Sequence, residues 1–405
     1  MTDPSAALPL SGLRVLDAGT YVAGSYAATV LGEFGAEVIK LEPPGAGDPL
    51  RRIGTPSARA DATQLWLSEG RNKKSVTLDT ARPEGAALLR RLAARADVLV
   101  ESFGPGVLEA RGLGWDVLRE ANPGLVLLRM SGYGQTGPLR HRPGIGHLAQ
   151  AFGGLSYLAG FPGEPPVVPG TPFLGEYMAG LYGAIGVLVA LAHRDRTGRG
   201  QVVDTAVSEA VLRELDEMVV VYGLLGRRRR REGAGTVTAC PHGHFRTQDD
   251  KWVAIACTTD RMFARLAGDA MGRPELAAPD RYGRQAQRRA ARDEVERLVS
   301  AFTESLPRDA LMQRCVAAGV PIGRINSIAD IFADPQFQAR GDLVTVHEPD
   351  VGDVVVPAVV PKLSKTPGRI ASLGPPLGSA TETVLRDLLG LDAAALARLR
   401  AAGAV

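Results

Sequence analysis

The sequence has few cysteines and almost no excess of either charge. Its three cysteines, Cys240, Cys257 and Cys315, lie far apart among 405 residues and show no paired spacing. This argues against a disulfide framework or a four-ligand zinc site, and it makes a reducing cytoplasm the expected compartment. Lys and Arg number 47 against 44 Asp and Glu, which gives a net charge of +3. So small an excess does not create the field of a nucleic-acid binder, and nucleic acid is not an expected partner.

Long hydrophobic runs are also missing. The most apolar stretch, residues 177–192, is rich in Gly and Ala and is shorter than the ~20 residues that cross a bilayer. We expect a buried helix there and no membrane partner. The first eleven residues contain no basic segment followed by an apolar one, so no signal peptide is expected. Hydrophobic residues make up 45% and charged residues 22%, as in ordinary soluble globular proteins.

The first half of the chain alternates short apolar β-rich runs with helical patterns. This rhythm is typical of a parallel sheet with helices on both faces, so we expect an α/β fold. Helices are expected over 25–33 and 83–95, and another begins near Ser208. The expected strands are 13–17, 36–41, 75–78, 97–101, 125–130 and 201–207.

The run Arg227–Arg231, followed by a Gly-rich segment, interrupts this pattern. One basic cluster without interleaved aromatic residues is more typical of a solvated connection than of a nucleic-acid or lipid site. We therefore expect a large domain over 1–226, a linker and a small α+β domain over 227–332, and a return to the large domain over 333–405. The small domain should hold a strand pair (244–246 and 252–256) and helices near 261–271 and 288–304, and a last helix is expected over 382–389.

The segment 18–24, Ala-Gly-Thr-Tyr-Val-Ala-Gly, follows the first expected strand and opens a helix. It resembles a nucleotide-binding turn but lacks the three-glycine dinucleotide fingerprint, so a nicotinamide cofactor is disfavoured. Two interpretations stay open. The turn either has no ligand or receives an anion at the helix start near Val22 and Ala23.

Lys73 and Phe103 are expected at the rim of the sheet. A lysine there can pair with a phosphate, and an aromatic ring beside the Gly-rich turn 104–106 can stack on an adenine. Taken singly, such residues are more often a surface charge and a core aromatic. Together they suggest that a nucleotide-containing ligand lies along the carboxyl ends of the first strands.

Glu176 is an acidic residue at the start of the apolar helix. A carboxylate in this position often only stabilises the helix dipole, by ~0.3 to 1 kcal/mol. The preceding Gly175 would let a substrate approach closely, and a lone carboxylate above an apolar helix can act as a nucleophile. Both interpretations are open on the residues alone.

Metal and thiol chemistry have weak support. His242 and His244 share one face of an expected strand, but no third ligand is near them in sequence. His147 is interpreted as structural, and the cysteines lack an activating pattern. No metal site is predicted.

Several of these segments, taken in order, resemble the class III coenzyme A transferase family, also called CaiB/BaiF. The resemblance runs from about Leu13 to the carboxyl end, and the whole series carries it. Its segments are 13–17, 35–42, 72–75, 101–106, 175–177, 197–201 and 319–321.

The resemblance implies a Rossmann-like large domain built from both chain ends, a small domain between them and two interlocked protomers. The partner is expected to be a second copy of the chain or a paralogous subunit. Glu176 would attack an acyl-CoA thioester and form a mixed anhydride and then a glutamyl thioester, with no metal or redox cofactor. Coenzyme A itself would be the substrate, held by Val22, Ala23, Lys73, Phe103 and Arg111. We expect succinyl-CoA as donor and malate or citramalate as acceptor.

The sequence departs from the family pattern at two positions. Glu176 stands where the family most often has aspartate, and Pro43 stands where a basic residue is common. Arg51, Arg52 or Arg111 would then supply part of the nucleotide contact. Two other functions stay open: an α-methylacyl-CoA racemase, disfavoured because residues 144–146 are Gly-Ile-Gly instead of Gly-His-Asp, and a catalytically silent acyl-CoA-binding protein.

Overall fold

The computed structural model describes residues 7–144 and 146–405. It divides the chain into two compact units. The first unit takes the chain up to Leu155, then Val168–Leu224 and Gln338–Val405, and the second takes Ser156–Val167 and Leu225–Phe337. The first unit is thus built from both ends of the chain, with the second inserted between them.

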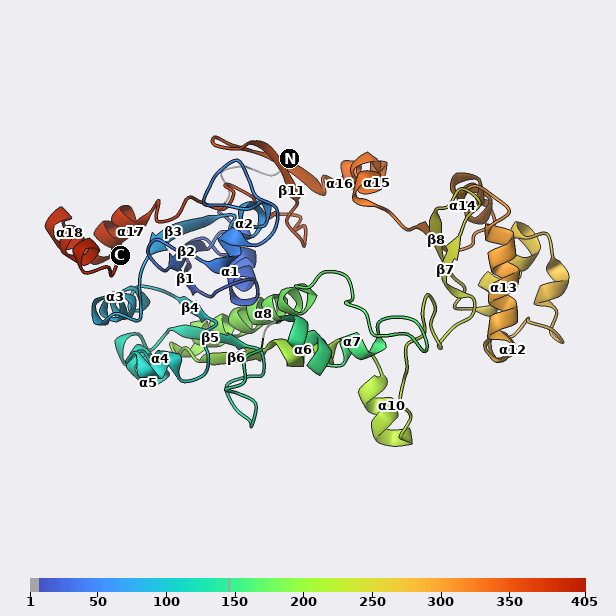
Figure 1. Cartoon of the computed structure of the whole chain (residues 1–405), viewed down its shortest axis with the longest axis horizontal. Helices are drawn as coiled ribbons and strands as arrows, with labels where there is room; N and C mark the ends of the chain where they lie inside the picture. Colours follow the sequence, from blue (N-terminus) through green and yellow to red (C-terminus); the bar gives the residue numbers. More distant parts are fainter. Residues whose placement is uncertain (1–6, 145) are drawn as a thin grey trace. The chain divides into compact units, whose positions relative to one another are not determined.

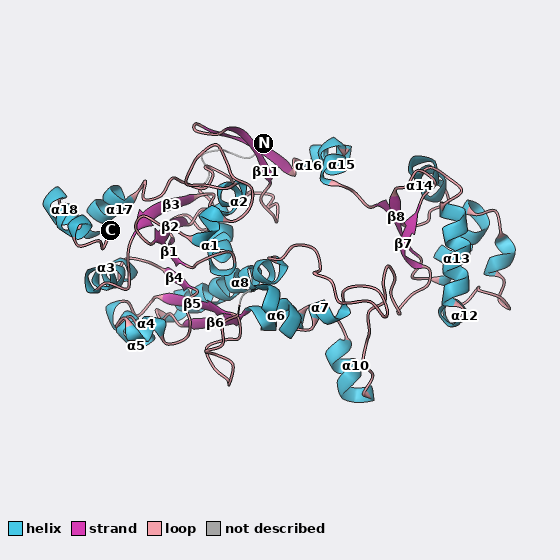
Figure 2. Cartoon of the chain, viewed as in Figure 1, coloured by secondary structure: helices cyan, strands magenta, loops and turns pink. Residues whose placement is uncertain are grey.

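A six-stranded sheet forms the centre of the first unit (Figures 1 and 2). Each neighbouring pair of strands is parallel, and the order is β3-β2-β1-β4-β5-β6, the order of a Rossmann sheet. The expected α/β fold is confirmed, and each expected strand begins and ends within two residues of an observed one. The strands are β1 (Arg14–Ala18), β2 (Glu37–Glu42), β3 (Lys73–Thr77), β4 (Val98–Glu101), β5 (Val126–Ser131) and β6 (Val202–Ala206).

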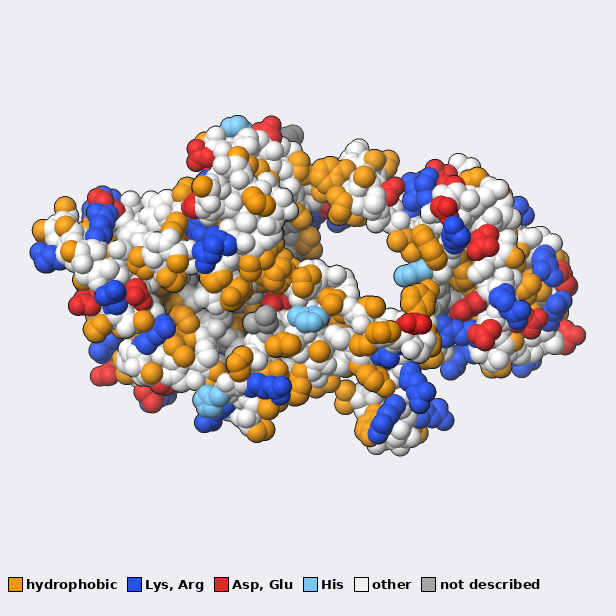
Figure 3. Space-filling view, viewed as in Figure 1, with side chains coloured by type: hydrophobic (Ala, Val, Ile, Leu, Met, Phe, Trp, Pro, Cys, Tyr) orange, Lys and Arg blue, Asp and Glu red, His pale blue; other side chains and the backbone are white. Residues whose placement is uncertain are grey.

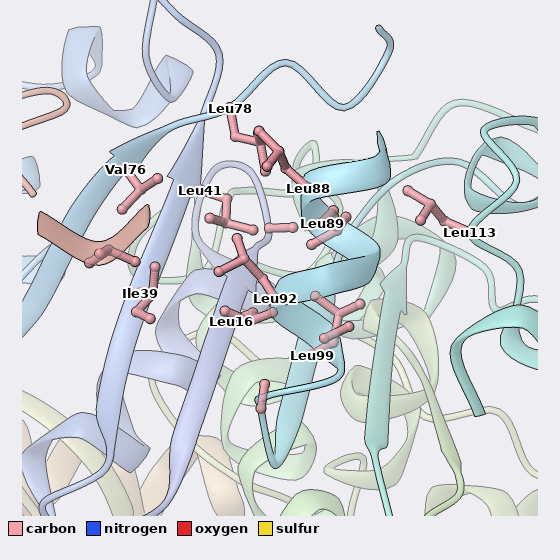
Figure 4. Close-up of a cluster of buried hydrophobic side chains, with 14 of the residues drawn as sticks. Leu16, Ile39, Leu41, Val76, Leu78, Leu88, Leu89, Leu92, Leu99 and Leu113 are labelled. Atoms are coloured by element: carbon pink, nitrogen blue, oxygen red, sulfur yellow. The ribbon is translucent and has the colours of Figure 1, made fainter. Parts of the chain in front are cut away.

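Helices cover both faces of this sheet because successive strand residues point to opposite sides. Leu16 belongs to one apolar core and Val15 to the other. Figure 4 shows the first core, where Leu88, Leu89 and Leu92 of α3 (Pro83–Ala93) point toward the leucines and isoleucine of the strands. The helices of the second core include α1 (Ala23–Glu33), α6 (Gly146–Phe152), α8 (Leu174–Thr197) and α9 (Val207–Arg213).

Shorter helical elements connect these parts. They are η1 (Pro49–Arg52), α2 (Gln64–Glu69), α4 (Val107–Ala110), α5 (Trp115–Ala121) and α10 (Met218–Leu225), while α7 (Leu155–Leu158) begins in the first unit and continues into the second.

Helix α8 has 24 residues, more than the 16 expected from its apolar stretch. By length and composition alone it could cross a membrane, a test that core helices of soluble proteins also pass. Half of its most apolar window is buried inside the protein, in the core that it forms with α1 and β5. It ends at Gly198, which adopts the left-handed conformation that favours glycine. We therefore describe α8 as a core helix, as the sequence predicts.

The carboxyl-terminal segment lies against the β3 edge of the sheet. The backbone N–H of Asn72 donates to the carbonyl of Ser372 (3.0 Å), and that of Asp79 donates to Ala404 (2.9 Å). This return covers an edge strand that would otherwise present unpaired backbone groups. Its elements are the antiparallel hairpin β10 (Leu343–Glu348) and β11 (Gly352–Pro357), then α17 (Thr381–Leu389) and α18 (Ala393–Ala401).

The second unit has a small antiparallel sheet with the order β7-β8-β9 and its own apolar core. Mixed acidic and basic side chains cover much of its visible surface (Figure 3). One helix was expected over 288–304, but two are found, because the chain leaves helical geometry at Ala291. The elements are β7 (His242–Arg246), β8 (Trp252–Ala256), α11 (Asp260–Arg265), the π-helical η2 (Leu266–Ala270), η3 (Pro274–Ala277), α12 (Gln285–Ala290), α13 (Arg292–Thr303), α14 (Arg308–Ala317), β9 (Ile322–Arg324), α15 (Ile328–Ala333) and the start of α16 (Pro335–Arg340), whose last residues, from Gln338, belong to the first unit.

The expected limits of the small domain, 227 and 332, lie close to the observed limits of its longer segment, 225 and 337. The segment 156–167, which we assigned to the large domain, groups with the second unit instead. The reason is a pair of hydrogen bonds: Gly233 N–H to Gly160 O (3.1 Å) and the Arg231 guanidinium to Tyr157 O (3.0 Å).

Four buried charges lie beneath the turn that joins β1 to α1, and we call them the buried charge cluster: Asp17, Lys40, Asp48 and Lys73. Lys73 Nζ lies 2.9 Å from Asp17 Oδ2, and Lys40 Nζ lies 2.7 Å from Asp48 Oδ2. Burial alone raises the pKa of Asp17, but the two lysines outweigh it and hold this pKa below its ordinary value. Two positive and two negative charges thus balance inside the fold.

This cluster allows a test with a built-in control, because Lys73 and its neighbour Lys74 differ in burial. The Lys73 side chain is fully buried, whereas that of Lys74 is 54% exposed and pairs with Glu37. We expect Lys73→Met to lower the free energy of unfolding by about 3 kcal/mol or more, because it removes one partner of a buried pair. Lys74→Met should lower it by less than ~1 kcal/mol. Chemical denaturation followed by circular dichroism measures both, and equal effects would contradict the assignment of Lys73 to the cluster.

Candidate active site

Glu176 is the third residue of α8, and its side chain is buried although it is charged. Its Oε1 atom accepts a hydrogen bond from the backbone N–H of Gly146 at 2.8 Å. Its Oε2 atom is buried and has no hydrogen-bond partner among the described residues. A buried carboxylate oxygen without a partner is unusual, because it forfeits the hydrogen bonds that water would give it. No described protein group therefore occupies the lone pairs of this oxygen.

The electrostatics of Glu176 follow from this setting. Burial raises the pKa of the carboxyl group above its ordinary value, and it outweighs the opposing effects of the backbone N–H groups of Glu176 and Gly146 and of the exposed His147. A carboxylate with a raised pKa is more weakly solvated and a better nucleophile than one in water. The site can thus present an ionised but poorly stabilised oxygen.

Close packing holds the start of α8 in place. A Cβ on Gly175 would lie 3.1 Å from Gln150 Cγ and 3.2 Å from Val207 Cγ1, so the backbone here fits tightly against α6 and α9. Gln150 Nε2 donates to the carbonyl of Pro172 at 2.8 Å. One turn beyond Glu176, a Cβ on Gly180 would lie 2.9 Å from the carbonyl of Ala23. Glycine at 180 therefore brings the helix of Glu176 against the start of α1.

Val22 and Ala23 lie at the start of α1, where the sequence places them, and both are buried. The turn before them meets the turn that follows β4, since Thr20 N–H donates to Ser102 Oγ at 2.7 Å. β1 and β4 are neighbours whose connecting helices pass to opposite sides of the sheet. In sheets of this order the crevice between two such strands is the usual ligand site.

Lys73 does not lie at the carboxyl rim where we expected it. It begins β3, in register with Val38 of β2, and so stands at the amino end of its strand. Its Nζ atom donates to Asp17 Oδ2, Ser25 O (2.7 Å) and Ser25 Oγ (2.8 Å). These contacts engage the ammonium group of Lys73 inside the protein. The difference from our expectation arises because β3 begins two residues earlier than expected, so that Lys73 is part of the sheet. A direct contact of Lys73 with coenzyme A stays a prediction.

Phe103 and Arg111 are brought together just beyond β4. The Arg111 guanidinium carbon lies 4.7 Å from the centre of the Phe103 ring, and Arg111 Nη1 donates to Thr80 Oγ1 at 2.5 Å. Phe103 N–H donates to the carboxylate of Glu101 (2.7 Å), which is also bound by Arg129. The ring and the cation form one half-buried unit suited to an adenine or a phosphate.

The other two arginines proposed for the nucleotide lie elsewhere. Arg51 is buried and forms two hydrogen bonds with Glu42, with its Nε at 2.6 Å and its Nη2 at 2.8 Å. Arg52 is exposed and donates to the carbonyl of Ala46. Of the three candidates, Arg111 is the one that the structure places beside Phe103.

The remaining sequence candidates do not form a reactive cluster. Within 7–144 and 146–405, no group of three or more His, Cys, Asp or Glu side chains could hold a metal ion, and His242 and His244 lie on β7 without a third ligand. The cysteines are buried, which raises the pKa of Cys240 and Cys315 to about 11 and that of Cys257 to about 12. Thiols with such values are poor nucleophiles.

Sequence reasoning missed Gly146, which touches the Glu176 carboxylate. The segment 144–146 was noted because it lacks Gly-His-Asp and precedes His147, and its middle residue, Ile145, lies outside the described residues. The glycine itself was the available signal, since glycine often marks a close approach to backbone.

Comparison with known proteins agrees with this geometry. The family model of CoA-transferase family III matches residues 10–381. The chain is 58% identical over 393 residues to the succinyl-CoA–L-malate CoA-transferase alpha subunit of Chloroflexus aurantiacus, covering 97% of this chain and 92% of that one. It is 42% identical over 393 residues to the succinyl-CoA–D-citramalate CoA-transferase of the same species, covering 97% of each chain.

A solved structure agrees as well. The crystal structure of a CaiB/BaiF family protein from Brucella suis superimposes with a TM-score of 0.84 at 32% identity, covering 95% of this chain and all of that one. The chain therefore belongs to CoA-transferase family III, and it is a CoA transferase, an enzyme that moves coenzyme A from an acyl-CoA to a free carboxylate.

Proposed function

We propose that the enzyme moves coenzyme A from succinyl-CoA to malate, or to the related hydroxy acid citramalate, through covalent intermediates on Glu176. The observation that carries the proposal is the buried Glu176 carboxylate, one oxygen of which has no hydrogen-bond partner within 7–144 and 146–405. The similarity to the malate and citramalate enzymes supports the choice of substrates. No metal or redox cofactor takes part in this cycle, and we place it in the cytoplasm.

The carboxylate oxygen serves first as a nucleophile. Glu176 Oε2 attacks the thioester carbonyl of succinyl-CoA, the C–S bond breaks, and coenzyme A leaves as thiolate. The product is a mixed anhydride of succinate and Glu176. The thiolate then attacks Cδ of Glu176, which breaks the Cδ–Oε2 bond, releases succinate and leaves a glutamyl thioester.

The acceptor reverses these steps. A carboxylate oxygen of malate attacks Cδ of the thioester, and thiolate leaves again, which forms a second anhydride. Thiolate then attacks the malyl carbonyl, so that malyl-CoA forms and Glu176 regains a free carboxylate. Because coenzyme A must stay bound between the two halves of the cycle, the site needs firm contacts to its nucleotide.

The contacts that we propose for coenzyme A lie where β1 and β4 diverge. The backbone of Val22 and Ala23 faces the phosphates, and Phe103 with Arg111 holds the adenine. Gly180 packs against Ala23 one turn from Glu176, so this placement brings the thioester end near the nucleophile.

An exposed apolar stripe on α8 supports the proposed interlocked dimer. Leu181, Ile185, Leu188 and Val189 recur at helical spacing, and each is at least 41% exposed. Helix α10 also exposes apolar residues, since Val220 and Leu224 are 61% and 77% exposed. Exposed apolar residues that recur along one helix face are typical of a protein contact. We propose that a second copy of the chain, or a paralogous subunit, covers the stripe.

The covalent mechanism is tested with Glu176→Gln, which keeps the shape of the side chain but removes the nucleophilic oxygen. We expect kcat to fall at least about 10³-fold. Glu176→Asp should retain part of the activity, because the reactive group is kept while its reach shortens by ~1.5 Å. After incubation with succinyl-CoA and hydroxylamine, peptide mapping should find the modification on Glu176 of the wild type. Full activity in Glu176→Gln with an unmodified wild-type peptide would contradict the mechanism.

The nucleotide placement is tested with Phe103→Ala and Arg111→Ala. Each should raise KM for succinyl-CoA about tenfold, since stacking on one base contributes ~1 to 3 kcal/mol, and leave kcat nearly unchanged. Arg119→Ala is the control, because Arg119 is an exposed arginine of α5 paired with Asp116. Unchanged KM values for succinyl-CoA in both site variants would show that the nucleotide binds elsewhere.

The dimer is tested by placing a charge in the apolar stripe. Ile185→Glu should shift the protein from dimer to monomer or aggregate in light scattering, because a buried interface excludes an unpaired carboxylate. Val316→Glu is the control, since Val316 of α14 is 63% exposed and lies outside the stripe. An active wild-type monomer at micromolar concentration would refute the proposal.

A further inference from the structure

The space beside Gly146 is filled by the reactive group. A Cβ on Gly146 would lie 1.5 Å from Oε2, 1.8 Å from Cδ and 2.1 Å from Oε1 of Glu176. These are its three nearest atoms, and all belong to the one carboxyl group. The glutamate carboxylate therefore occupies the volume in which any other residue at position 146 would begin its side chain.

Backbone conformation does not explain this glycine. Gly146 is the first residue of α6, and alanine is readily accepted at a helical position. The packing around it explains more. Next to Glu176, a Cβ on Gly175 would lie 3.1 Å from Gln150 Cγ and 3.4 Å from Gly146 O, so α8 already lies close against α6 and leaves little space for a side chain at position 146. Position 146 therefore needs a residue that has no side chain, because the Glu176 carboxylate occupies that space.

The backbone N–H of Gly146 adds a second role. It holds Oε1 at 2.8 Å, whereas Oε2 has no hydrogen-bond partner among the described residues, so this N–H determines which oxygen reacts. When thiolate attacks Cδ of the anhydride, negative charge develops on Oε1. An N–H group already aimed at that atom stabilises the charge without reorganisation.

We propose that Gly146 is a positioning residue matched to glutamate at position 176. Its missing side chain forms the slot for the longer carboxylate, and its N–H fixes the orientation of that carboxylate. The proposal rests on the CoA-transfer mechanism above. Aspartate at 176 is one methylene shorter, so it needs less of the slot and tolerates a side chain at 146. The two positions are therefore coupled, and glutamate requires glycine.

A double-mutant cycle tests the coupling with wild type, Gly146→Ala, Glu176→Asp and the double variant. Gly146→Ala should fold with an unchanged or higher Tm, because the displaced atoms are the end of a flexible side chain. Its kcat should fall about 100-fold, as for a ~1 Å misplacement of a reacting group, while KM for succinyl-CoA changes less than about twofold. The double variant should be more active than Gly146→Ala, a rescue that a merely structural role for Gly146 would not give.

Gly268→Ala is the matched control. Gly268 is a helical glycine of the second unit whose Cβ would meet its nearest neighbour at 3.8 Å, an ordinary contact, so kcat should not change. Wild-type kcat in Gly146→Ala, additive losses in the double variant, or failure of Gly146→Ala to fold would each overturn the inference.

A crystal structure of Gly146→Ala separates this inference from the proposed function. The Glu176 carboxylate should leave its slot by at least about 1 Å, whatever reaction the enzyme performs. If the wild type transferred no coenzyme A, the proposed function would fail, while a displaced carboxylate would still support the steric match. An undisplaced carboxylate beside the new methyl group would refute the match.

Discussion

The buried charge cluster is the constraint on which the rest of the site depends. Asp17 of β1 pairs with lysines from β2 and β3, so three strands share one set of charges that water cannot reach. Such charges are tolerated only when they balance and every donor has a partner. The cluster meets this requirement through the turn itself: Asp17 accepts from Gly19 N–H and Ser25 Oγ, and Lys40 donates to Gly19 O. The position of α1 is thereby fixed, and the strands cannot shift in register without separating the charges.

Close packing at two glycines connects this fixed turn to the nucleophile Glu176. Gly180 lets α8 meet the carbonyl of Ala23, and Gly146 lets the same helix bring a carboxylate against the backbone of α6. In both contacts one partner is backbone: the carbonyl of Ala23 in the first and the N–H of Gly146 in the second. The site thus depends on places where backbone segments approach closely. This explains why the residues that form it do not stand out in the sequence. Catalytic groups on rigid elements hold their orientation better than groups on loops.

The sequence predicts the fold well because most strands contain short apolar runs that alternate with helical patterns, a spacing that identifies a parallel sheet. It also predicts Glu176 and the neighbourhood of Phe103. The burial of Lys73 could not be predicted from the sequence. In the run Asn-Lys-Lys-Ser, alternation tells that the two lysines point to opposite faces, but only the distant Asp17 decides which face is internal. Gly146 shows a second limit, since its contact with Glu176 spans 30 residues and depends on how α6 meets α8.

Reactivity of the Glu176 carboxylate and stability of the fold place opposite requirements on the hydrogen-bonding of Oε2. An unpartnered buried oxygen costs roughly 1 to 3 kcal/mol, so selection for stability alone would favour a partner for Oε2. A partner would lower the pKa of Glu176 and reduce its nucleophilicity. The structure separates the two demands between the two oxygens: Oε1 has an N–H donor that fixes its position, and Oε2 is left poorly solvated. Apolar packing of α8 against α1 and β5 stabilises the helix that carries this unfavourably buried oxygen, so reactivity at one end of α8 depends on burial along the rest of it.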